Sequence, residues 1–320
     1  MAQAGTGFDL ERVERETQRI GRELFDKVKH EAGAFFRSER WTGQLLEWSM
    51  RHGDTRLQLF RFVDVLPTLN DPEDVVRHLR EYFDGKPDPF GGLLKVGLGM
   101  AGMGRLGAMA TASALRKGVE QVARTFIAGT NTEEVLKVVE QLHRQGQGFT
   151  VDVLGEATLS EAEAETYRRR YLELLEALTA RAPRWPKVDQ VDAAPWGPIP
   201  RVNVSVKLSS LYSQLDPIDP ETSTREVIAR LRPIVRLAKE RGAHIHIDME
   251  DYKVKDLTLH IFRTLCDDPE FKDYRYLGIV LQAYLKDSEM DARNLIEWAR
   301  QRGTPVTVRL VKGAYWDFET

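Results

Sequence analysis

The sequence has one cysteine, no long apolar run and no excess of either charge, and each of these absences excludes a class of protein. A single cysteine, Cys266, cannot form an intramolecular disulfide, so a disulfide-stapled secreted domain is excluded and a reducing compartment is favoured. We expect Cys266 to be a small buried side chain, because it lies in a run with a helical pattern, residues 257–266. Residues 1–12 contain no apolar segment behind a basic patch, which argues against a secretory signal. The protein is therefore expected to be cytoplasmic.

The charge balance gives no sign of a nucleic-acid partner. Lysine and arginine number 46 against 49 aspartate and glutamate residues, for a net charge of −3, whereas nucleic-acid binders carry clustered basic residues. The segment of residues 93–119 is rich in Gly, Ala and Met, but Lys95, Arg105 and Arg116 leave charge-free stretches of only about ten residues. A transmembrane helix needs about 20 apolar residues, so we expect a small-residue helix packed closely on a neighbour. An amphipathic helix lying on a membrane surface is the alternative.

The first part of the chain has helical patterns. Residues 1–90 are predicted to form an α-helical arm and residues 91–146 a helical linker region. In the arm, Ile20, Leu24 and Val28 recur at a spacing that places them on one side of a helix. We expect this part to contribute core or interface residues rather than catalytic ones.

Residues 147–320 alternate between strand and helix patterns. Runs rich in β-branched residues predict strands, and capping residues or glycines mark the helices between them. Strands connected by helices in this way must be parallel, so the region is either a (β/α) barrel or an open doubly wound sheet. The predicted strands are residues 149–155, 201–209, 243–249, 277–284 and 305–311.

The two faces of each predicted strand differ in polarity. In the second strand, Ser205 and Lys207 alternate with Val204 and Val206, and the fifth strand carries Arg309 among apolar neighbours. Strands of a doubly wound sheet, which helices cover on both sides, are expected to be apolar on both faces. A barrel explains the pattern, because its outer face packs on helices while its inner face can hold polar groups. The fold class is therefore predicted to be α/β, a partial barrel that follows the helical arm.

Polar residues gather near the carboxyl ends of these strands, where barrel enzymes keep their chemistry. We interpret them as one solvent-lined site rather than as five separate ion pairs. The set offers no serine or cysteine paired with a histidine, so no acyl-enzyme nucleophile is evident. The G-x-G-x-x-G pattern at residues 97–102 follows no predicted strand and is not a dinucleotide-binding loop. The five residues are Glu156, Lys207, Asp248, Gln282 and Arg309.

A possible metal site lies in the third strand, at His244-x-His246-x-Asp248. Alternate strand residues lie on one face about 6.6 Å apart, so two of the three could bind one ion. A metal-dependent hydrolase would need further ligands from other strands, and none of these carries a histidine. We favour the interpretation that His244 and His246 fill the barrel interior, with Asp248 alone at the mouth.

Four strand motifs carry a resemblance to a known family. They look like consecutive strand motifs of the proline dehydrogenase family, in the right order and at plausible spacing. The form with Trp-Asp after Gly-Ala-Tyr resembles most closely the bifunctional proline utilization A proteins, in which a second domain oxidises glutamate semialdehyde. The resemblance covers about residues 90–320. The motifs are VSVKLS at residues 204–209, IDME at 247–250, VLQAY at 280–284 and VRLVKGAYWD at 308–317.

The resemblance implies a (β/α)8 barrel that holds FAD. The reaction would be the oxidation of L-proline to pyrroline-5-carboxylate by hydride transfer to the flavin N5, with electrons passed to a membrane quinone. Arg309 would contact the flavin near N5, where a fixed positive charge stabilises the reduced ring, and Gln282 would hydrogen-bond the ring edge. The remaining cofactor-binding residues would be Val311, Lys312, Gly313, Ala314 and Trp316.

The resemblance also assigns catalytic positions. Lys207 would help to hold the substrate carboxylate, and Asp248 would orient its polar neighbours. Tyr315 would form a wall of the proline site. Glu156 would pair with a gating arginine from elsewhere in the protein. No metal is implied.

Five predicted strands are fewer than the eight of a closed barrel. Either the native protein is longer, with the remaining barrel and an aldehyde dehydrogenase domain in the same chain, which is the interpretation that we favour, or the missing strands come from another chain. Residues 1–320 alone are expected neither to retain FAD nor to oxidise proline. The resemblance further implies a homo-oligomer with peripheral contact to the inner membrane. Two alternatives stay open, a metal-dependent barrel hydrolase that uses His244 and His246, and an inactive scaffold.

Overall fold

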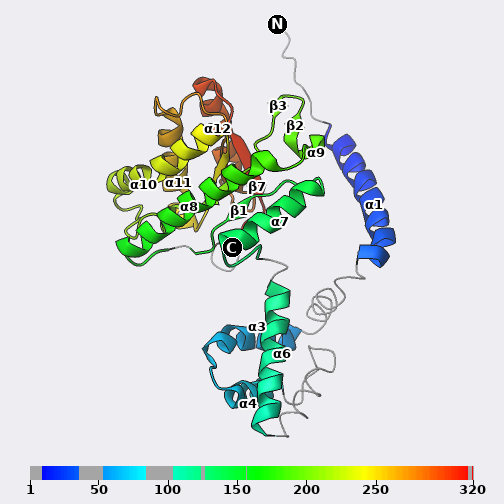
Figure 1. Ribbon diagram of the computed structural model, residues 1–320. Helices are drawn as coiled ribbons and strands as arrows, with labels where there is room; N and C mark the ends of the chain where they lie inside the picture. Colours follow the sequence, from blue (N-terminus) through cyan, green and yellow to red (C-terminus); the bar gives the residue numbers. More distant parts are fainter. Residues whose placement is uncertain are drawn as a thin grey trace. The chain divides into compact units, whose positions relative to one another are not determined.

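The computed structural model describes residues 9–35, 53–83, 104–123, 127–155, 157–315 and 319. The chain divides into two compact units, Met1–Ile127 and Ala128–Thr320 (Figure 1). The domain boundaries predicted at residues 90 and 146 stay predictions.

The described part of the first unit is helical, which confirms the N-terminal helical region. Its small core joins Phe62, Leu79 and Leu115, from three different helices. Ala112 is almost fully buried in the same cluster, so one side of the Gly/Ala-rich helix packs closely on its neighbours, whereas Leu106 and Met109 are exposed. Residues 93–103 lie outside the described residues. The elements are α1 (Leu10–Phe35), α3 (Gly53–Val65), the 3-10 helix η1 (Leu66–Thr68), α4 (Pro72–Phe83) and α6 (Arg105–Ala123).

Within the described residues, no helix combines the length and the apolar character that a bilayer span requires. This agrees with the charges that interrupt the Gly/Ala-rich segment in the sequence.

The second unit is built on a parallel sheet of five strands, in the order β1-β4-β5-β6-β7. All five strands were predicted, although each is shorter than its sequence pattern. A short antiparallel pair, β2 with β3, was not predicted, since each of its strands has only two residues. The strands are β1 (Val151–Asp152), β2 (Ala193–Ala194), β3 (Gly197–Pro198), β4 (Asn203–Val206), β5 (His244–Ile247), β6 (Leu277–Gln282) and β7 (Thr307–Val311).

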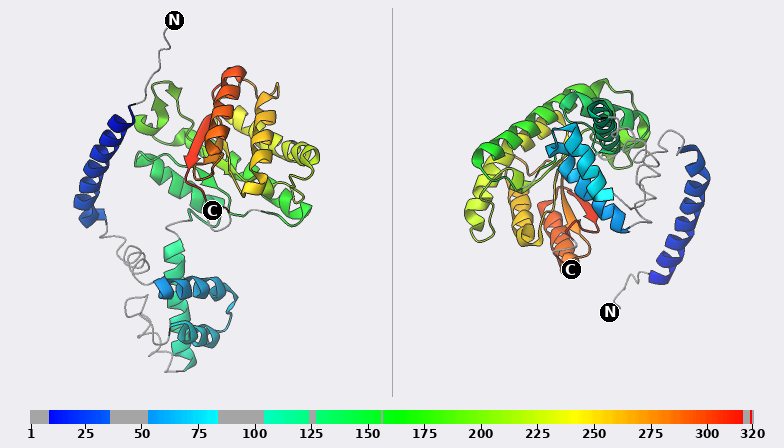
Figure 2. Two further views of the ribbon diagram at one scale, coloured as in Figure 1. Left: turned by 180° about the vertical axis from the view of Figure 1, so that it is seen from behind. Right: turned by 90° about the horizontal axis from the view of Figure 1, so that it is seen from below.

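Helices connect the strands and cover the outer side of the sheet (Figures 1 and 2). The longest, α10, begins earlier than its pattern suggested, because Asp219 accepts a hydrogen bond from the Thr222 N–H and Pro220 suits the first turn. The helices are α7 (Thr132–Arg144), α8 (Glu161–Arg181), α9 (Asp189–Asp192), α10 (Pro220–Arg241), α11 (Lys255–Asp267) and α12 (Ser288–Arg302). Short 3-10 helices are η2 (Ala182–Arg184), η3 (Leu208–Ser210) and η4 (Tyr252–Val254).

The core of this unit lies between the sheet and the helices. Val204, Ile245 and Ile279 point into it from three neighbouring strands and are fully buried. Cys266 is also fully buried there, as predicted, and burial raises the pKa of its thiol to about 12. The outer face of β7 differs, because Val308 and Leu310 are exposed among the described residues.

The sheet is curved rather than flat. Three strand spacings separate β4 from β7, which is roughly 14 Å in a flat sheet. Arg309 Nη2 on β7 nevertheless lies 3.4 Å from Ser205 Oγ on β4. The inner side chains of distant strands therefore converge, as they do inside a barrel.

Candidate functional site

A chain of alternating charges occupies the concave side of the sheet near the carboxyl ends of the strands. Lys207 Nζ lies 2.5 Å from Asp152 Oδ2 and 3.4 Å from Asp248 Oδ2. The other oxygen of Asp248 accepts hydrogen bonds from Arg309 Nη2 and, at 2.6 Å, from the Ser205 hydroxyl. Two cations thus share one carboxylate, and four strands or their ends contribute to a single network.

The strand register places these residues side by side. Ser205 pairs with His246 and Val206 with Ile247, so the next residues along the two strands, Lys207 and Asp248, are also neighbours. Alternation along each strand sends both side chains to the inner face. Arg309 reaches Asp248 from β7, and its side chain keeps 36% exposure while that of Asp248 keeps 11%.

Burial and pairing change the acid–base behaviour of the lysine and its partner. Burial raises the pKa of Asp152, and the hydrogen bond from Lys207 only partly opposes this. Burial would lower the pKa of Lys207, but the hydrogen bond and charge of Asp152, with the charge of Asp248, raise it overall. Lys207 is therefore a fixed cation at neutral pH.

Gln282 links two of the loops that follow the strands. It is buried, its Nε2 lies 3.3 Å from the Glu250 carbonyl, and its Oε1 accepts the Ala314 N–H at 3.2 Å. Ala314 and Lys312 are themselves exposed. The backbone after β7 is thus anchored from within the protein while its side chains face outward.

Gly313 allows one close approach in this segment. It has φ of 143°, in the region that favours glycine, and a Cβ there would overlap the Tyr284 ring. The Tyr284 hydroxyl lies 3.3 Å from the backbone nitrogen of Tyr315 and also bonds to Glu319. Glycine is needed here because the ring of Tyr284 packs directly on the backbone.

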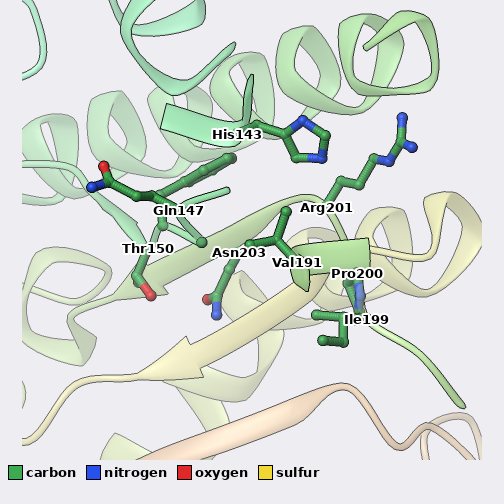
Figure 3. Close-up of a pocket in the computed structure, with 10 residues that line it drawn as sticks. His143, Gln147, Thr150, Val191, Ile199, Pro200, Arg201 and Asn203 are labelled. Atoms are coloured by element: carbon green, nitrogen blue, oxygen red, sulfur yellow. The ribbon is translucent and has the colours of Figure 1, made fainter. Parts of the chain in front are cut away.

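A cavity of about 330 Å³ lies at the opposite, amino ends of the strands (Figure 3). Thr150 and Asn203 line it, together with His143 and Arg201. Arg201 and His143 both bond to Asp192, and although burial opposes it, these bonds hold the pKa of that carboxyl down at about 2. None of the predicted site residues lines this cavity.

Comparison with known proteins identifies the family. The proline dehydrogenase family matches residues 135–320, and the proline utilization A N-terminal domain matches residues 14–126. The chain belongs to the proline dehydrogenase family. Members of this family are typically flavin-dependent.

Individual relatives agree with this assignment. The chain is 30% identical over 209 residues to the bifunctional protein PutA of Escherichia coli K12, covering 64% of this chain and 15% of that protein. It is 33% identical over 208 residues to the proline dehydrogenase of Deinococcus radiodurans, covering 62% of this chain and 57% of that protein. A crystal structure of proline utilization A from Bdellovibrio bacteriovorus, inactivated by N-propargylglycine, is 44% identical, with a TM-score of 0.75.

The chain matches only part of its longer relatives. It covers 15% of the Escherichia coli PutA protein. The Bdellovibrio alignment takes in 87% of this chain and 27% of that one. A barrel is the fold that the family implies.

The predicted site residues of this proline dehydrogenase relative fall into three groups. The structure brings Lys207, Asp248 and Arg309 into one network. The second group adjoins this network: Gln282 ends β6, Val311 ends β7, and Lys312, Gly313, Ala314 and Tyr315 follow β7. Glu156 and Trp316 lie outside the described residues.

Several residues of the site were missed by sequence reasoning. Asp152 and Ser205 lie on the polar faces of their strands, so the alternation that found Lys207 could also have found them. Tyr171 on α8 is fully buried, and its hydroxyl accepts the Lys207 N–H at 3.3 Å. Burial raises the pKa of Tyr171 to about 12. No local pattern distinguishes Tyr171 from an ordinary core tyrosine.

The donor set fits one side of a flavin site. A fixed cation, Arg309, stands at the mouth beside an exposed backbone turn, residues 312–314. Such a set suits an electron-rich ring, which gains from a nearby positive charge and from a flat backbone surface. Asp248 balances the charge of Arg309 from the side of the strands, which leaves the exposed part of the guanidinium for a ligand.

Proposed function

We propose that this chain supplies the first part of the catalytic centre of an FAD-dependent proline dehydrogenase. The reaction is the oxidation of L-proline to pyrroline-5-carboxylate, with a quinone as the final electron acceptor. The bound FAD would supply the hydride acceptor at its N5 atom. The observation that carries the proposal is the shared carboxylate, since Asp248 holds both Lys207 and Arg309 at the mouth of a proline dehydrogenase-family sheet.

Each member of the network has a separate task. Lys207, a fixed cation with 14% of its side chain exposed, binds the carboxylate of proline. Asp248 orients both cations through its two oxygens. Arg309 stabilises negative charge on the reduced ring. Tyr315 and the backbone of residues 312–314 border the ligand, and Val311 and Gln282 support that border from the strand ends.

Proline oxidation by hydride transfer requires that the substrate be positioned against the acceptor, and it requires no protein nucleophile. Hydride transfer needs a bound acceptor and an oriented substrate, because the cofactor carries the difficult step. The Asp152–Lys207–Asp248–Arg309 network supplies paired charges of both signs, which matches an amino-acid zwitterion. Two further residues complete the proposed set: Glu156 would pair with a gating arginine from elsewhere in the protein, and Trp316 would line the flavin.

The wider biology is part of the same proposal. We place the protein in the cytoplasm at the inner membrane surface, as a homo-oligomer whose remaining barrel and aldehyde dehydrogenase domain belong to the same longer chain. A metal-dependent hydrolase is the alternative; among the residues that the structure describes, no group of three or more His, Cys, Asp or Glu side chains is placed to hold a metal ion.

Purified full-length protein tests the proposal directly. We expect a flavin absorbance spectrum that bleaches when proline is added without an electron acceptor, and dye reduction that depends on proline. Lys207→Met should raise KM for proline by about tenfold or more, since it removes a charged contact. A colourless protein without proline-dependent dye reduction would overturn the proposal, and elemental analysis would then decide whether a metal is bound.

A further inference from the structure

A second set of hydrogen bonds lies behind the charge network and centres on Glu250. This glutamate is 5% exposed. Its Oε2 accepts the Ser209 N–H at 3.1 Å, and its Oε1 accepts the Ser209 hydroxyl. The carboxylate therefore ties the segment after β5 to the segment after β4.

Ser209 extends these bonds to the loop after β1. Its Oγ accepts the Ala157 N–H at 2.8 Å, and its carbonyl accepts the Thr158 N–H at 3.2 Å and the Thr158 hydroxyl at 3.0 Å. Ala157 has φ of 51°, a left-handed conformation that a non-glycine residue keeps only where its surroundings hold it. Ser209 supplies that support.

The backbone of Glu250 extends the bonds in the other direction. Its carbonyl accepts a hydrogen bond from Nε2 of Gln282, the last residue of β6, and Gln282 Oε1 accepts the Ala314 N–H after β7. Ala157, Ser209, Glu250, Gln282 and Ala314 thus join the segments that follow β1, β4, β5 and β7 to the end of β6. We call this set the mouth ring.

Two residues of the mouth ring lie close in sequence to charged residues of the proposed site. Ser209 follows Lys207 by two positions and Glu250 follows Asp248 by two, so these two ring members fix the strand ends that carry Lys207 and Asp248. A buried carboxylate with two donors from one residue is a strong and directional anchor. Small shifts at such anchors matter, because misplacement of reacting groups by about 1 Å can cost 10²-fold in rate.

We propose that Glu250 is a positioning residue, which sets the spacing of Lys207, Asp248 and the segment after β7 through the mouth ring. It touches neither substrate nor cofactor in this role. The claim about geometry stands on the hydrogen bonds alone, and the claim about catalysis rests on the proposed proline dehydrogenase function.

The chain contains a matched control pair. Ser213 donates its N–H at 3.1 Å and its hydroxyl at 2.7 Å to Oε1 of Glu161, so a serine again bonds one glutamate through both of its donors, at an exposed place outside the ring. Ser209→Ala and Glu250→Gln are therefore compared with Ser213→Ala and Glu161→Gln. Ser209→Thr keeps a hydroxyl and serves as the conservative rescue.

Hydrogen–deuterium exchange of full-length protein tests the hydrogen bonds of the mouth ring and does not require an active enzyme. Ser209→Ala should speed exchange of the Ala157 amide at least about tenfold, because its acceptor is removed. The Thr158 amide, whose acceptor is the retained carbonyl, should change less. Glu250→Gln should speed exchange at Ser209 and Ala314. Unchanged exchange in these variants, or the same changes in the control pair, would contradict the claim that the hydrogen bonds of the mouth ring hold these segments in place.

Steady-state kinetics of the flavin-loaded enzyme test the claim that Glu250 positions the catalytic residues. Glu250→Gln and Ser209→Ala should lower kcat for proline by about tenfold, the lower part of the range for residues that act through a neighbour, with Ser209→Thr near wild type. The control pair should leave kcat unchanged. Faster exchange with unaltered kcat would overturn the positioning role alone. If wild-type protein shows no proline oxidation, the proposed function is wrong. The exchange experiment would still show whether the mouth ring holds the strand ends in place.

Discussion

Two arginines at opposite ends of the sheet show that a buried position does not by itself mark an arginine as a ligand-binding residue. Arg302 ends α12 near the amino ends of the strands, is 7% exposed, and donates five hydrogen bonds to backbone carbonyls. Arg309 lies on β7, keeps 36% exposure of its side chain, and shares one carboxylate with Lys207. Both are cations within a largely apolar unit.

The difference lies in how many donors the protein itself uses. A guanidinium has five N–H donors, and the carbonyls of Cys266, Phe271 and Tyr274, with those of Thr304 and Pro305, occupy all sides of Arg302. Arg309 contacts Asp248 and Ser205 through a single nitrogen in the described structure. A saturated arginine holds loops together, whereas a partly used one remains available to a ligand.

The largest effect is expected from Arg302→Met. The change leaves several buried carbonyls without donors and should lower the free energy of unfolding by about 3 kcal/mol or more. Denaturant titration measures it, and the exposed neighbour Arg300→Met is the control, with a change within about 0.5 kcal/mol. Equal effects of the two substitutions would show that Arg302 does not hold the loops.

Arg309→Met should show the reverse pattern. We expect flavin reduction by proline to fall by about 10²-fold, the usual cost of losing one electrostatic stabiliser, while the free energy of unfolding changes by less than about 1 kcal/mol. Stopped-flow absorbance and denaturant titration give the two numbers. A large loss of stability with normal flavin reduction would mean that Arg309 is a structural ion pair like Arg302.

A smaller effect is expected from Gly278→Ala in the floor of the site. An added Cβ would lie 2.6 Å from His246 Nε2 and 2.9 Å from His244 Nε2, so the stacked pair must shift. Overpacking of this kind costs about 1–3 kcal/mol, measurable by thermal or denaturant unfolding. Gly148→Ala, which meets nothing within 4 Å, is the control, and an equally small change at both glycines would contradict the packing.

The histidine pair should also make stability depend on pH. Burial, with a smaller contribution from the charge of His246, lowers the pKa of His244 to about 3. Burial and the charge of Arg309 lower that of His246 to about 4, against the opposing charge of Asp248. Both rings are neutral when folded but bind protons below about 6.5 when unfolded. Stability is therefore complete above pH about 6.5 and declines as the pH falls toward these values.

The expected loss is roughly 1–2 kcal/mol for each histidine by pH 5. Denaturant titrations between pH 7 and pH 5 measure it. The double variant His244→Gln/His246→Gln should flatten the slope, and the exposed His260→Gln should leave it unchanged. A slope that survives the double variant would assign the pH dependence to other groups.

Local patterns predicted the elements and the polar side of the sheet. Strands, helices and the positions of Lys207, Asp248 and Arg309 followed from alternation and capping, because those signals lie within a few residues of one another. The same signals did not predict β2 and β3, because strands of two residues are too short to show the alternation of polar and apolar side chains. They also did not single out Asp152, which is the carboxylate that Lys207 contacts.

By itself, the sequence determined that five parallel strands present polar groups at one end, since a period of two residues sends alternate side chains to opposite faces. Only the tertiary structure decided which charges meet. The Lys207–Asp152, Arg309–Asp248 and Ser209–Glu250 contacts join residues 55, 61 and 41 positions apart. Such distances along the chain are closed by the curvature and register of the sheet, and no local pattern encodes either one.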